Sequence, residues 1–149
     1  MLARILILHI LLLSMVGCGG RTTTPTADPA LSSIPAQVAL IEEWGIEAES
    51  IKLSAAGYML DFRYKVLDPI KAAKVVNRKN KPYLLNERSG MTTRVPAPAN
   101  IGPLRHTGGN LKQNTKYFVL FSNPGRSISK GDHVTVVMGQ YKLEHISVE

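Results

Sequence analysis

Three histidines and a methionine carry the most recognisable chemistry in the chain, because imidazole and thioether groups are ligands for transition metals. His133 and Met138 lie in one run of alternating apolar residues and His145 lies in the next, so a hairpin could bring the two histidines together. The thioether would suit copper(I). No histidine, His106 included, has a partner at the short spacing of a familiar zinc motif. Copper binding or carriage by His133, Met138 and His145 is therefore an alternative function.

Residues that serve in catalysis are present, but they do not form a catalytic pattern. Asp132 and His133 are neighbours in sequence, so on a strand their side chains point to opposite faces and cannot orient each other as a triad requires. The sequence contains neither a Gly-x-Ser-x-Gly motif nor a phosphate-binding glycine motif. We therefore expect a protein without enzymatic activity and without a cofactor.

Positive charge is concentrated in the middle of the chain. Between Arg63 and Lys130 there are fourteen lysines and arginines, opposed only by Asp68 and Glu87, within a chain whose formal net charge is +7. Such a surface attracts anionic lipid headgroups, an acidic cell-wall polymer or an acidic protein. Lysines also protect the edges of sheets, so a solvated basic surface without a partner is the competing interpretation.

One long segment within this basic region has no regular pattern. Residues 96–114 read PAPANIGPLRHTGGNLKQN, and loops longer than about 12–15 residues are uncommon in compact domains unless they bind something or are disordered. A plain crossover between two sheets is equally consistent with the pattern. The candidate ligand or partner surface comprises the basic residues and the histidine in or beside this loop, namely Arg94, Arg105, His106, Lys112 and Lys116.

The only cysteine, Cys18, follows a segment with the composition of a secretory signal peptide. Arg4 precedes an apolar run over residues 5–13, which is shorter than the about 20 residues that a membrane-spanning helix needs. One unpaired thiol is unusual in an exported protein. Attachment of a lipid through the thiolate of Cys18 would account for it.

The segment Ser14-Met15-Val16-Gly17-Cys18 resembles the lipobox of bacterial lipoproteins, with Met15 in place of the usual leucine. The resemblance implies cleavage before Cys18, a diacylglycerol on its thiol and an acyl group on the new amino terminus. More than one chain gives stable membrane anchoring. In a double-membraned bacterium, the glycine that follows Cys18 favours the periplasmic face of the outer membrane, because an aspartate there is associated with inner-membrane retention. A nucleic-acid partner is not expected for such a protein.

Composition and length indicate one folded domain after this leader. The chain has 149 residues, of which 44% are hydrophobic and 19% charged, which is not the composition of a disordered chain. Residues 18–35 are rich in Gly, Thr, Ser and Pro, as in a flexible tether that could extend roughly 55 Å. We therefore expect a signal peptide over residues 1–17, a lipidated linker over 18–35 and a β-domain over 36–149.

Alternating apolar residues predict a mainly β domain. The clearest strand is 58–66, in which Tyr58, Leu60, Phe62, Tyr64 and Val66 share the core face. Residues 115–122 are apolar on both faces, as in an interior strand. The last hairpin loses its alternation between Leu143 and Ile146, which indicates a bulge. The predicted strands are 46–54, 58–66, 83–86, 91–95, 115–122, 133–138 and 141–148.

Two short helices complete the expected domain. One covers residues 35–43 and stops at Gly45, and the other begins with Asp68 as N-cap and Pro69 at the first position. In the second helix we expect Ile70, Ala73 and Val76 to face the core.

These elements predict an antiparallel sandwich, with a small open barrel as the alternative. The hairpin ending in Asp68-Pro69 and the strand ending in Asn123-Pro124 are similar to patterns in immunoglobulin-like bacterial envelope domains, which implies an immunoglobulin-like sandwich. The function expected from the sequence is that of a lipid-anchored cell-envelope protein acting as a non-catalytic binding or assembly module. Its expected contacts are the membrane, through the lipid, and an envelope protein or anionic surface.

Overall fold

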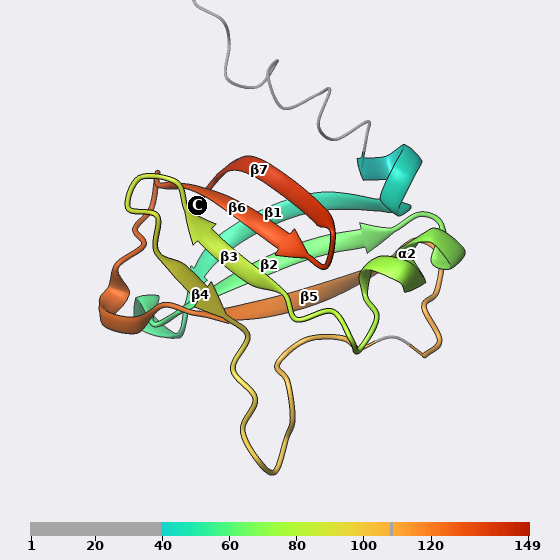
Figure 1. The fold of residues 1–149 in the computed structure, drawn as a ribbon, viewed down its shortest axis with the longest axis horizontal. Helices are drawn as coiled ribbons and strands as arrows, with labels where there is room; N and C mark the ends of the chain where they lie inside the picture. Colours follow the sequence, from blue (N-terminus) through green and yellow to red (C-terminus); the bar gives the residue numbers. More distant parts are fainter. Residues whose placement is uncertain (1–39, 108) are drawn as a thin grey trace, which may run out of the picture.

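The computed structural model describes residues 40–107 and 109–149 (Figure 1). The predicted signal peptide, Cys18 and the linker over residues 18–35 lie outside this range. Within it, no helix has both the length and the apolar composition needed to cross a membrane.

The domain consists of two packed antiparallel sheets, as the sequence predicts (Figure 1). The three-stranded sheet has the order β1-β2-β5, and the four-stranded sheet has the order β4-β3-β6-β7. The strands are β1 (Ile46–Ser54), β2 (Met59–Val66), β3 (Tyr83–Asn86), β4 (Thr92–Arg94), β5 (Thr115–Ser122), β6 (His133–Met138) and β7 (Tyr141–Ser147). Short 3-10 turns, η2 (Ala55–Gly57) and η3 (Pro124–Arg126), follow β1 and β5.

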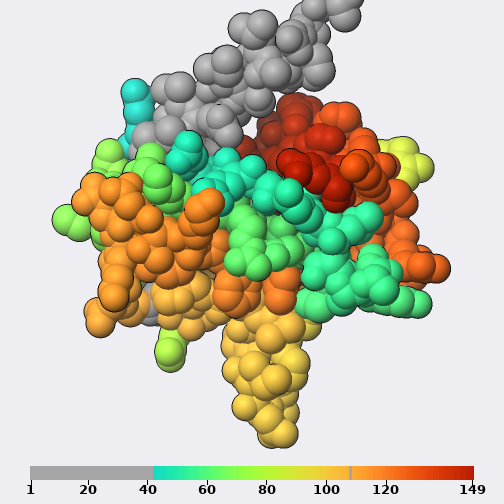
Figure 2. Space-filling view, turned by 180° about the vertical axis from the view of Figure 1, so that it is seen from behind, coloured from blue at the N-terminus to red at the C-terminus, as the bar shows by residue number. Residues whose placement is uncertain are grey.

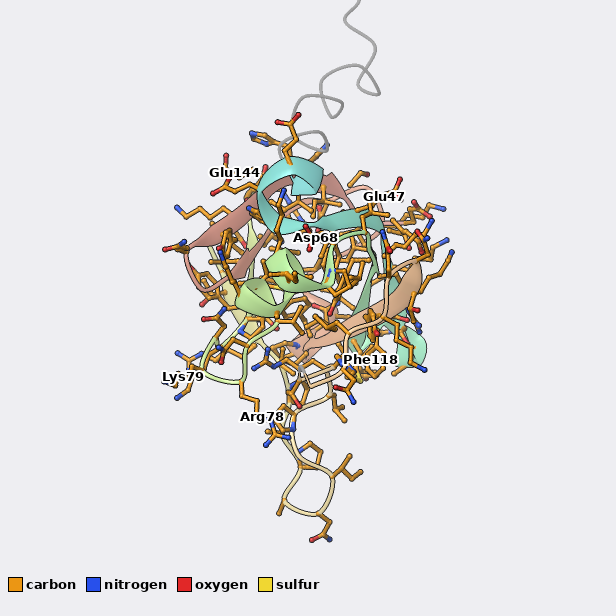
Figure 3. The ribbon with its side chains drawn as sticks, turned by 90° about the vertical axis from the view of Figure 1, so that its right-hand side faces the viewer. Glu47, Asp68, Arg78, Lys79, Phe118 and Glu144 are labelled. Carbon is orange, nitrogen blue, oxygen red and sulfur yellow. The ribbon has the colours of Figure 1, made fainter. Side chains whose placement is uncertain are left out.

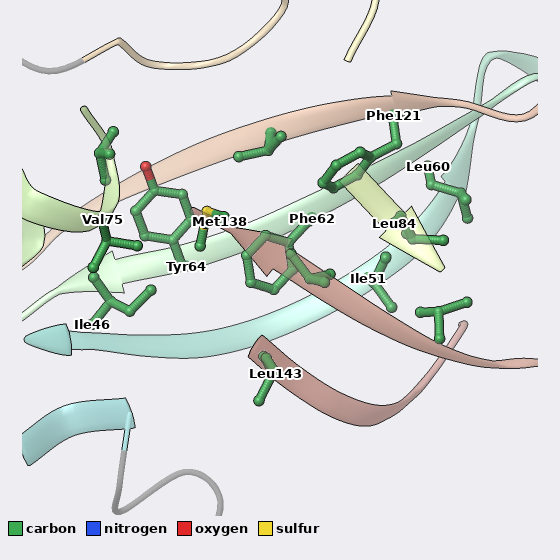
Figure 4. Close-up of a cluster of buried hydrophobic side chains, with 14 of the residues drawn as sticks. Ile46, Ile51, Leu60, Phe62, Tyr64, Val75, Leu84, Phe121, Met138 and Leu143 are labelled. Atoms are coloured by element: carbon green, nitrogen blue, oxygen red, sulfur yellow. The ribbon is translucent and has the colours of Figure 1, made fainter. Parts of the chain in front are cut away.

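The core lies between the sheets and is centred on β2 (Figure 4). Leu60, Phe62, Tyr64 and Val66 are fully buried, so the predicted alternation is confirmed over the strand itself. Leu60, Phe62 and Val66 each contribute about 1.5–3 kcal/mol by leaving water. Tyr58 was predicted on the same face, but it precedes the strand and is exposed, with the guanidinium of Arg126 over its ring.

The edges of the two sheets are also bonded to each other. On one side Glu149 donates its N–H to the carbonyl of Ile51 at 2.9 Å and accepts from the N–H of Leu53 at 3.2 Å. On the other side the hydroxyl of Thr93 bonds to Ser122, whose own hydroxyl donates to the carbonyl of Arg94 at 3.1 Å. The sandwich therefore has a partial closure at both edges, a feature that it shares with the alternative barrel.

Helix α2 (Pro69–Val75) begins where the sequence predicts, but it buries a different face. The Asp68 carboxylate accepts from the N–H groups of Ile70 at 2.9 Å and Lys71 at 3.2 Å, which confirms the N-cap. Ala72 and Val75 are buried, whereas Ile70 is 80% exposed and Ala73 is exposed too. Of the three residues predicted to face the core, only Val76, which follows the helix as its C-cap, is buried. The helix has two nearly equal apolar stripes, and the one that leads to two consecutive valines buries more apolar surface.

A π-helical turn, η1 (Leu40–Trp44), stands in part of the range of the first predicted helix. Trp44 is buried, with its ring centroid 5.1 Å from that of Tyr141. Gly45 then takes φ +66°, and its carbonyl accepts from the N–H groups of Leu67 and Asp68 at 2.8 and 3.0 Å. A Cβ at this position would lie 2.7 Å from the carbonyl oxygen of Asp68, so only glycine fits.

Two further strand predictions have opposite outcomes. The prediction that β5 is an interior strand is wrong, because β5 lies at the edge of its sheet. Its outer edge is instead covered by loop residues, with Leu120 N–H donating to Leu104 at 2.9 Å and His106 N–H donating to Phe118 at 3.3 Å. The bulge in the last hairpin is confirmed, since the β6–β7 register shifts there and His145 takes φ +59°.

Candidate partner-binding surface at the basic end

The loop between β4 and β5 crosses from one sheet to the other and also forms a projection. Residues 96–103, here called the finger, stand clear of the body (Figures 1 and 2, yellow). A tight turn closes the finger, with the N–H groups of Gly102 and Ile101 donating to the carbonyl of Pro98 at 2.7 and 3.1 Å. At its base the N–H of Leu104 donates to the carbonyl of Pro96 at 2.9 Å. The finger contains no charged residue, and Ile101 is 75% exposed.

Arg105 fixes the base of the finger to the connection that follows α2. Its Nη2 donates to the carbonyl oxygens of Asn77 at 3.3 Å, Arg78 at 3.2 Å and Asn80 at 2.6 Å. Burial lowers the pKa of the Arg105 guanidinium, and the Tyr64 phenol acts in the opposite direction. Arg105 is therefore a structural clamp and does not offer its charge to a partner.

His106 and Tyr117 hold the second half of the loop. Their rings are tilted, with centroids 4.5 Å apart, and the Tyr117 hydroxyl accepts from the backbone N–H of Lys112 at 2.8 Å. Among the residues described, His106 Nε2 is buried without a hydrogen-bond partner. The imidazole thus contributes to packing and is not presented to a ligand.

The remaining candidate residues divide between paired and free charges. Lys116 forms an ion pair of 2.8 Å with Glu49, so much of its charge is neutralised. The side chains of Arg94 and Lys112 are exposed. The structure therefore does not gather the five predicted residues into one site. Two of them have structural roles, one is an ion-paired cation, and two are exposed cations.

A groove lies beside the loop, in a place that the sequence did not indicate. Its volume is about 670 Å³, and it runs between the outer face of α2 and residues 109–111. The groove is lined by Pro69, Ile70, Ala73, Asn77, Arg78, Gly109, Asn110 and Leu111. Ile70 and Ala73, which the sequence pattern assigned to the core, form part of its apolar lining. The sequence signal that could have indicated the groove is this apolar stripe of the short helix, which was assigned to the core.

The stretch of the chain that includes the finger carries no acidic residue. From residue 88 to residue 131 there is no aspartate or glutamate. Figure 3 places Arg78 beside the base of the finger and Lys79 farther out on the same half of the domain, with Glu47 and Glu144 at the opposite end, where the described chain begins. We call the end that carries the finger, the groove, Arg78 and Lys79 the basic end.

The three residues considered for copper do not come together. Met138 is 1% exposed and belongs to the core (Figure 4), whereas His133 is exposed at the other end of β6, roughly 17 Å away at about 3.3 Å per strand residue. Across the described ranges, no group of three or more His, Cys, Asp or Glu side chains is placed to hold a metal ion. The ligand set proposed from the sequence is therefore not assembled in this fold.

His145 instead pairs with Glu87. The Glu87 carboxylate accepts from the His145 backbone N–H and the Thr135 hydroxyl, and its second oxygen lies 2.8 Å from His145 Nδ1. Partial burial raises the pKa of Glu87, but the three hydrogen bonds together outweigh burial and lower it. The contacts hold the bulge that carries His145, which makes a structural role sufficient to explain the pair.

The comparisons with known proteins add no relative from which a role could be transferred. No family model, curated protein or solved structure matches the chain. The geometry of the basic end therefore carries the functional argument.

Proposed function

We propose that the protein is a lipid-anchored cell-envelope protein whose β-sandwich is a non-catalytic module that binds an acidic protein. The observation that carries this proposal is the groove at the basic end. Apolar side chains of α2 and Leu111 line it, Arg78 is part of its wall, and the sequence that forms its second wall lies in the stretch without acidic residues. Apolar burial would supply affinity, and the cations would steer and select an acidic partner.

The anchor supports the same function by fixing the location of the module. The lipobox resemblance assigns lipidation to Cys18, and the linker that follows could extend roughly 55 Å over residues 19–35. That reach exceeds the roughly 35 Å diameter of a domain of this size. The module could therefore turn freely beside the membrane, with the periplasmic face of the outer membrane as the proposed location.

The strand order supports an immunoglobulin-like sandwich of an altered kind. In the immunoglobulin constant arrangement, the fourth strand joins the sheet that contains the first, second and fifth strands. Here β4 pairs with β3 and so joins the other sheet. We propose that the fold is immunoglobulin-like with its fourth strand transferred, while the binding role rests on the groove and not on this likeness.

The proposal is tested by crosslinking the full-length lipoprotein in cells and identifying bound proteins by mass spectrometry. We expect a salt-sensitive complex that weakens at least tenfold in an Arg78→Glu, Lys112→Glu variant and is lost from the membrane fraction in a Cys18→Ser variant. Lys142→Glu is the matched control, because Lys142 is also exposed but lies on β7 in the other sheet. Equal binding by the double variant and the wild type would contradict the proposal.

The choice of Arg78 and Lys112 follows from the structure. Arg105 would be an unsuitable site for charge reversal, because its three hydrogen bonds hold the loop and their loss would disturb the fold. Arg78 and Lys112 have exposed side chains, so reversing their charge changes the surface alone.

A further inference from the structure

We infer that the finger is a preformed peg that inserts Ile101 into an apolar socket on the acidic protein bound at the basic end. The inference rests on the proposed function and names the second contact of that surface. It starts from the most projecting feature of the domain, which has no partner within the described structure and no charged side chain (Figures 1 and 2).

The finger is organised before any partner arrives. Three prolines, at 96, 98 and 103, restrict its backbone, and its turn is closed by the two hydrogen bonds to Pro98 and the one to Pro96. A segment that is already ordered loses little conformational entropy on binding. The prolines also lack N–H groups, so fewer backbone donors lose water when the finger is buried.

The chemistry of the tip suits an apolar socket. Ile101 is the largest apolar side chain of the finger and is 75% exposed, and small or apolar residues surround it in sequence. Complete burial of an isoleucine side chain corresponds to an affinity gain on the order of 10- to 100-fold. One well-placed side chain can therefore dominate this part of an interface.

The finger and the groove are joined in a way that lets one partner contact both. Arg105 bonds the base of the finger to the carbonyls of Asn77 and Arg78, and these same two residues line the groove. Figure 3 shows Arg78 beside the base of the finger. A protein that fills the groove would therefore lie next to the finger and contact Arg78, which lies between the two.

The shape of this surface suits a protein partner better than a lipid bilayer. A convex finger beside a concave groove needs a partner with matching relief, whereas a bilayer surface is flat. Even a myristoyl chain anchors a protein only marginally, and one isoleucine offers much less apolar surface.

The first test is site-specific photocrosslinking of the full lipoprotein in cells. A diazirine-bearing amino acid replaces Ile101 in one variant, Ala73 in the groove in a second, and exposed Ser129 in the β5–β6 connection in a third. We expect the same protein adduct at positions 101 and 73 and none at 129. Phospholipid adducts at position 101 would overturn the inference in favour of a bilayer.

The remaining outcomes separate the finger from the proposed function. A protein adduct at position 73 without one at 101 would leave the groove as the binding site and overturn the role of the finger. Absence of protein adducts at both positions would contradict the proposed function itself, and the inference would fall with it.

The second test measures affinity with the crosslinked protein after its purification. Ile101→Ala is expected to weaken binding at least tenfold, and Ile101→Val less than threefold, because valine retains most of the apolar surface. Asn100→Ala, at the neighbouring exposed position, is the control and should bind as the wild type does. An Ile101→Ala variant with unchanged affinity would overturn the inference even if the crosslink forms.

Discussion

Three connections cross between the sheets, and the two longest are stabilised in opposite ways. The α2 connection, residues 67–82, joins β2 to β3, and the finger connection, residues 95–114, joins β4 to β5. The first is held mainly by bonds between residues close in sequence. The second depends on bonds to distant residues, which is why local sequence patterns reveal the first and not the second.

The α2 connection contains its own stabilising contacts. Asp68 caps the start of the helix, and the Asn80 side-chain amide donates to the carbonyls of Lys74 at 3.0 Å and Val75 at 2.9 Å at its end. Its distant contacts come from Gly45, whose carbonyl receives the N–H groups that precede the helix, and from Arg105, which donates to three carbonyls after the helix. Helix capping is a local property, and the sequence shows it directly.

The finger connection is placed by three groups of distant contacts. Arg105 bonds to the α2 connection, the backbone of Leu104 and His106 bonds to β5, and the N–H of Asn114 donates to the carbonyl of Val66 at the end of β2. None of these contacts has a fixed sequence spacing. The comparison predicts that single changes at tertiary contacts will cost more stability than loss of the local cap.

The largest effect is expected at Gly45, where the α2 connection meets the start of β1. Gly45→Ala should lower the free energy of unfolding by about 3 kcal/mol, because it combines a left-handed backbone with a clash against Asp68 and Lys71. Gly90→Ala is the matched control, since Gly90 has φ +69° but open space around it, and should cost roughly 1 kcal/mol. Urea unfolding of both variants measures the difference, and equal losses would show that the clash is relieved.

The next effect concerns the clamp between the two connections. Arg105→Met keeps most of the apolar stem but removes three charge-assisted hydrogen bonds, so we expect a loss of about 2 kcal/mol in the free energy of unfolding. Hydrogen exchange of Leu120 N–H should also accelerate, because it donates to the adjacent Leu104. Arg94→Met, an exposed arginine at the other end of the loop, should change stability by less than about 0.5 kcal/mol. Similar losses in both variants would contradict the clamp.

A smaller effect is expected at the local cap. Asp68→Ala should cost about 1 kcal/mol, because two N–H groups at the start of α2 lose their acceptor. Asp68→Asn retains an acceptor and should recover most of that loss. Thermal unfolding distinguishes the two variants, and an equally unstable Asn variant would indicate that the negative charge matters more than the hydrogen bonds.

The sequence predicted elements whose signals are local, and it failed where burial depends on the partner. The alternation of apolar residues predicted β2, and the N-cap at Asp68 predicted the start of α2. The prediction for α2 was right for Val76 but wrong for Ile70 and Ala73, because Ile70 and Val75 occupy stripes of similar apolarity and only tertiary packing decides which one is buried. The sequence predicted β5 as an interior strand, because an apolar pattern is the same whether a strand or a loop covers the edge of that strand.

The surface predicted from the sequence and the groove described here share only the neighbourhood of the loop between β4 and β5. The long irregular segment drew attention to Arg105 and His106, but their contacts within the chain give them structural roles. Charge alone does not tell an arginine that binds carbonyls of its own chain from one that faces solvent. The groove was missed because it combines residues about forty positions apart, such as Ile70 and Leu111.

The smallest effect is expected at Tyr64, which lies close enough to Arg105 for their charges to interact. Its hydroxyl is buried without a hydrogen-bond partner among the described residues, so Tyr64→Phe should change the free energy of unfolding at neutral pH by less than about 0.5 kcal/mol, against about 2 kcal/mol for Arg105→Met. Burial raises the pKa of Tyr64, while Arg105 opposes that shift.

The raised pKa determines the sign of the pH dependence. Below the ordinary tyrosine pKa of about 10, Tyr64 is neutral in both states and its contribution to stability is intact. Above it, the unfolded chain loses the proton first, so stability falls as pH rises, and Tyr64→Phe should make that fall less steep. Urea unfolding at pH 7 and about 10.5 tests both statements. A loss above about 1 kcal/mol at neutral pH would instead mean that the hydroxyl helps to hold Arg105, joining the core to the clamp.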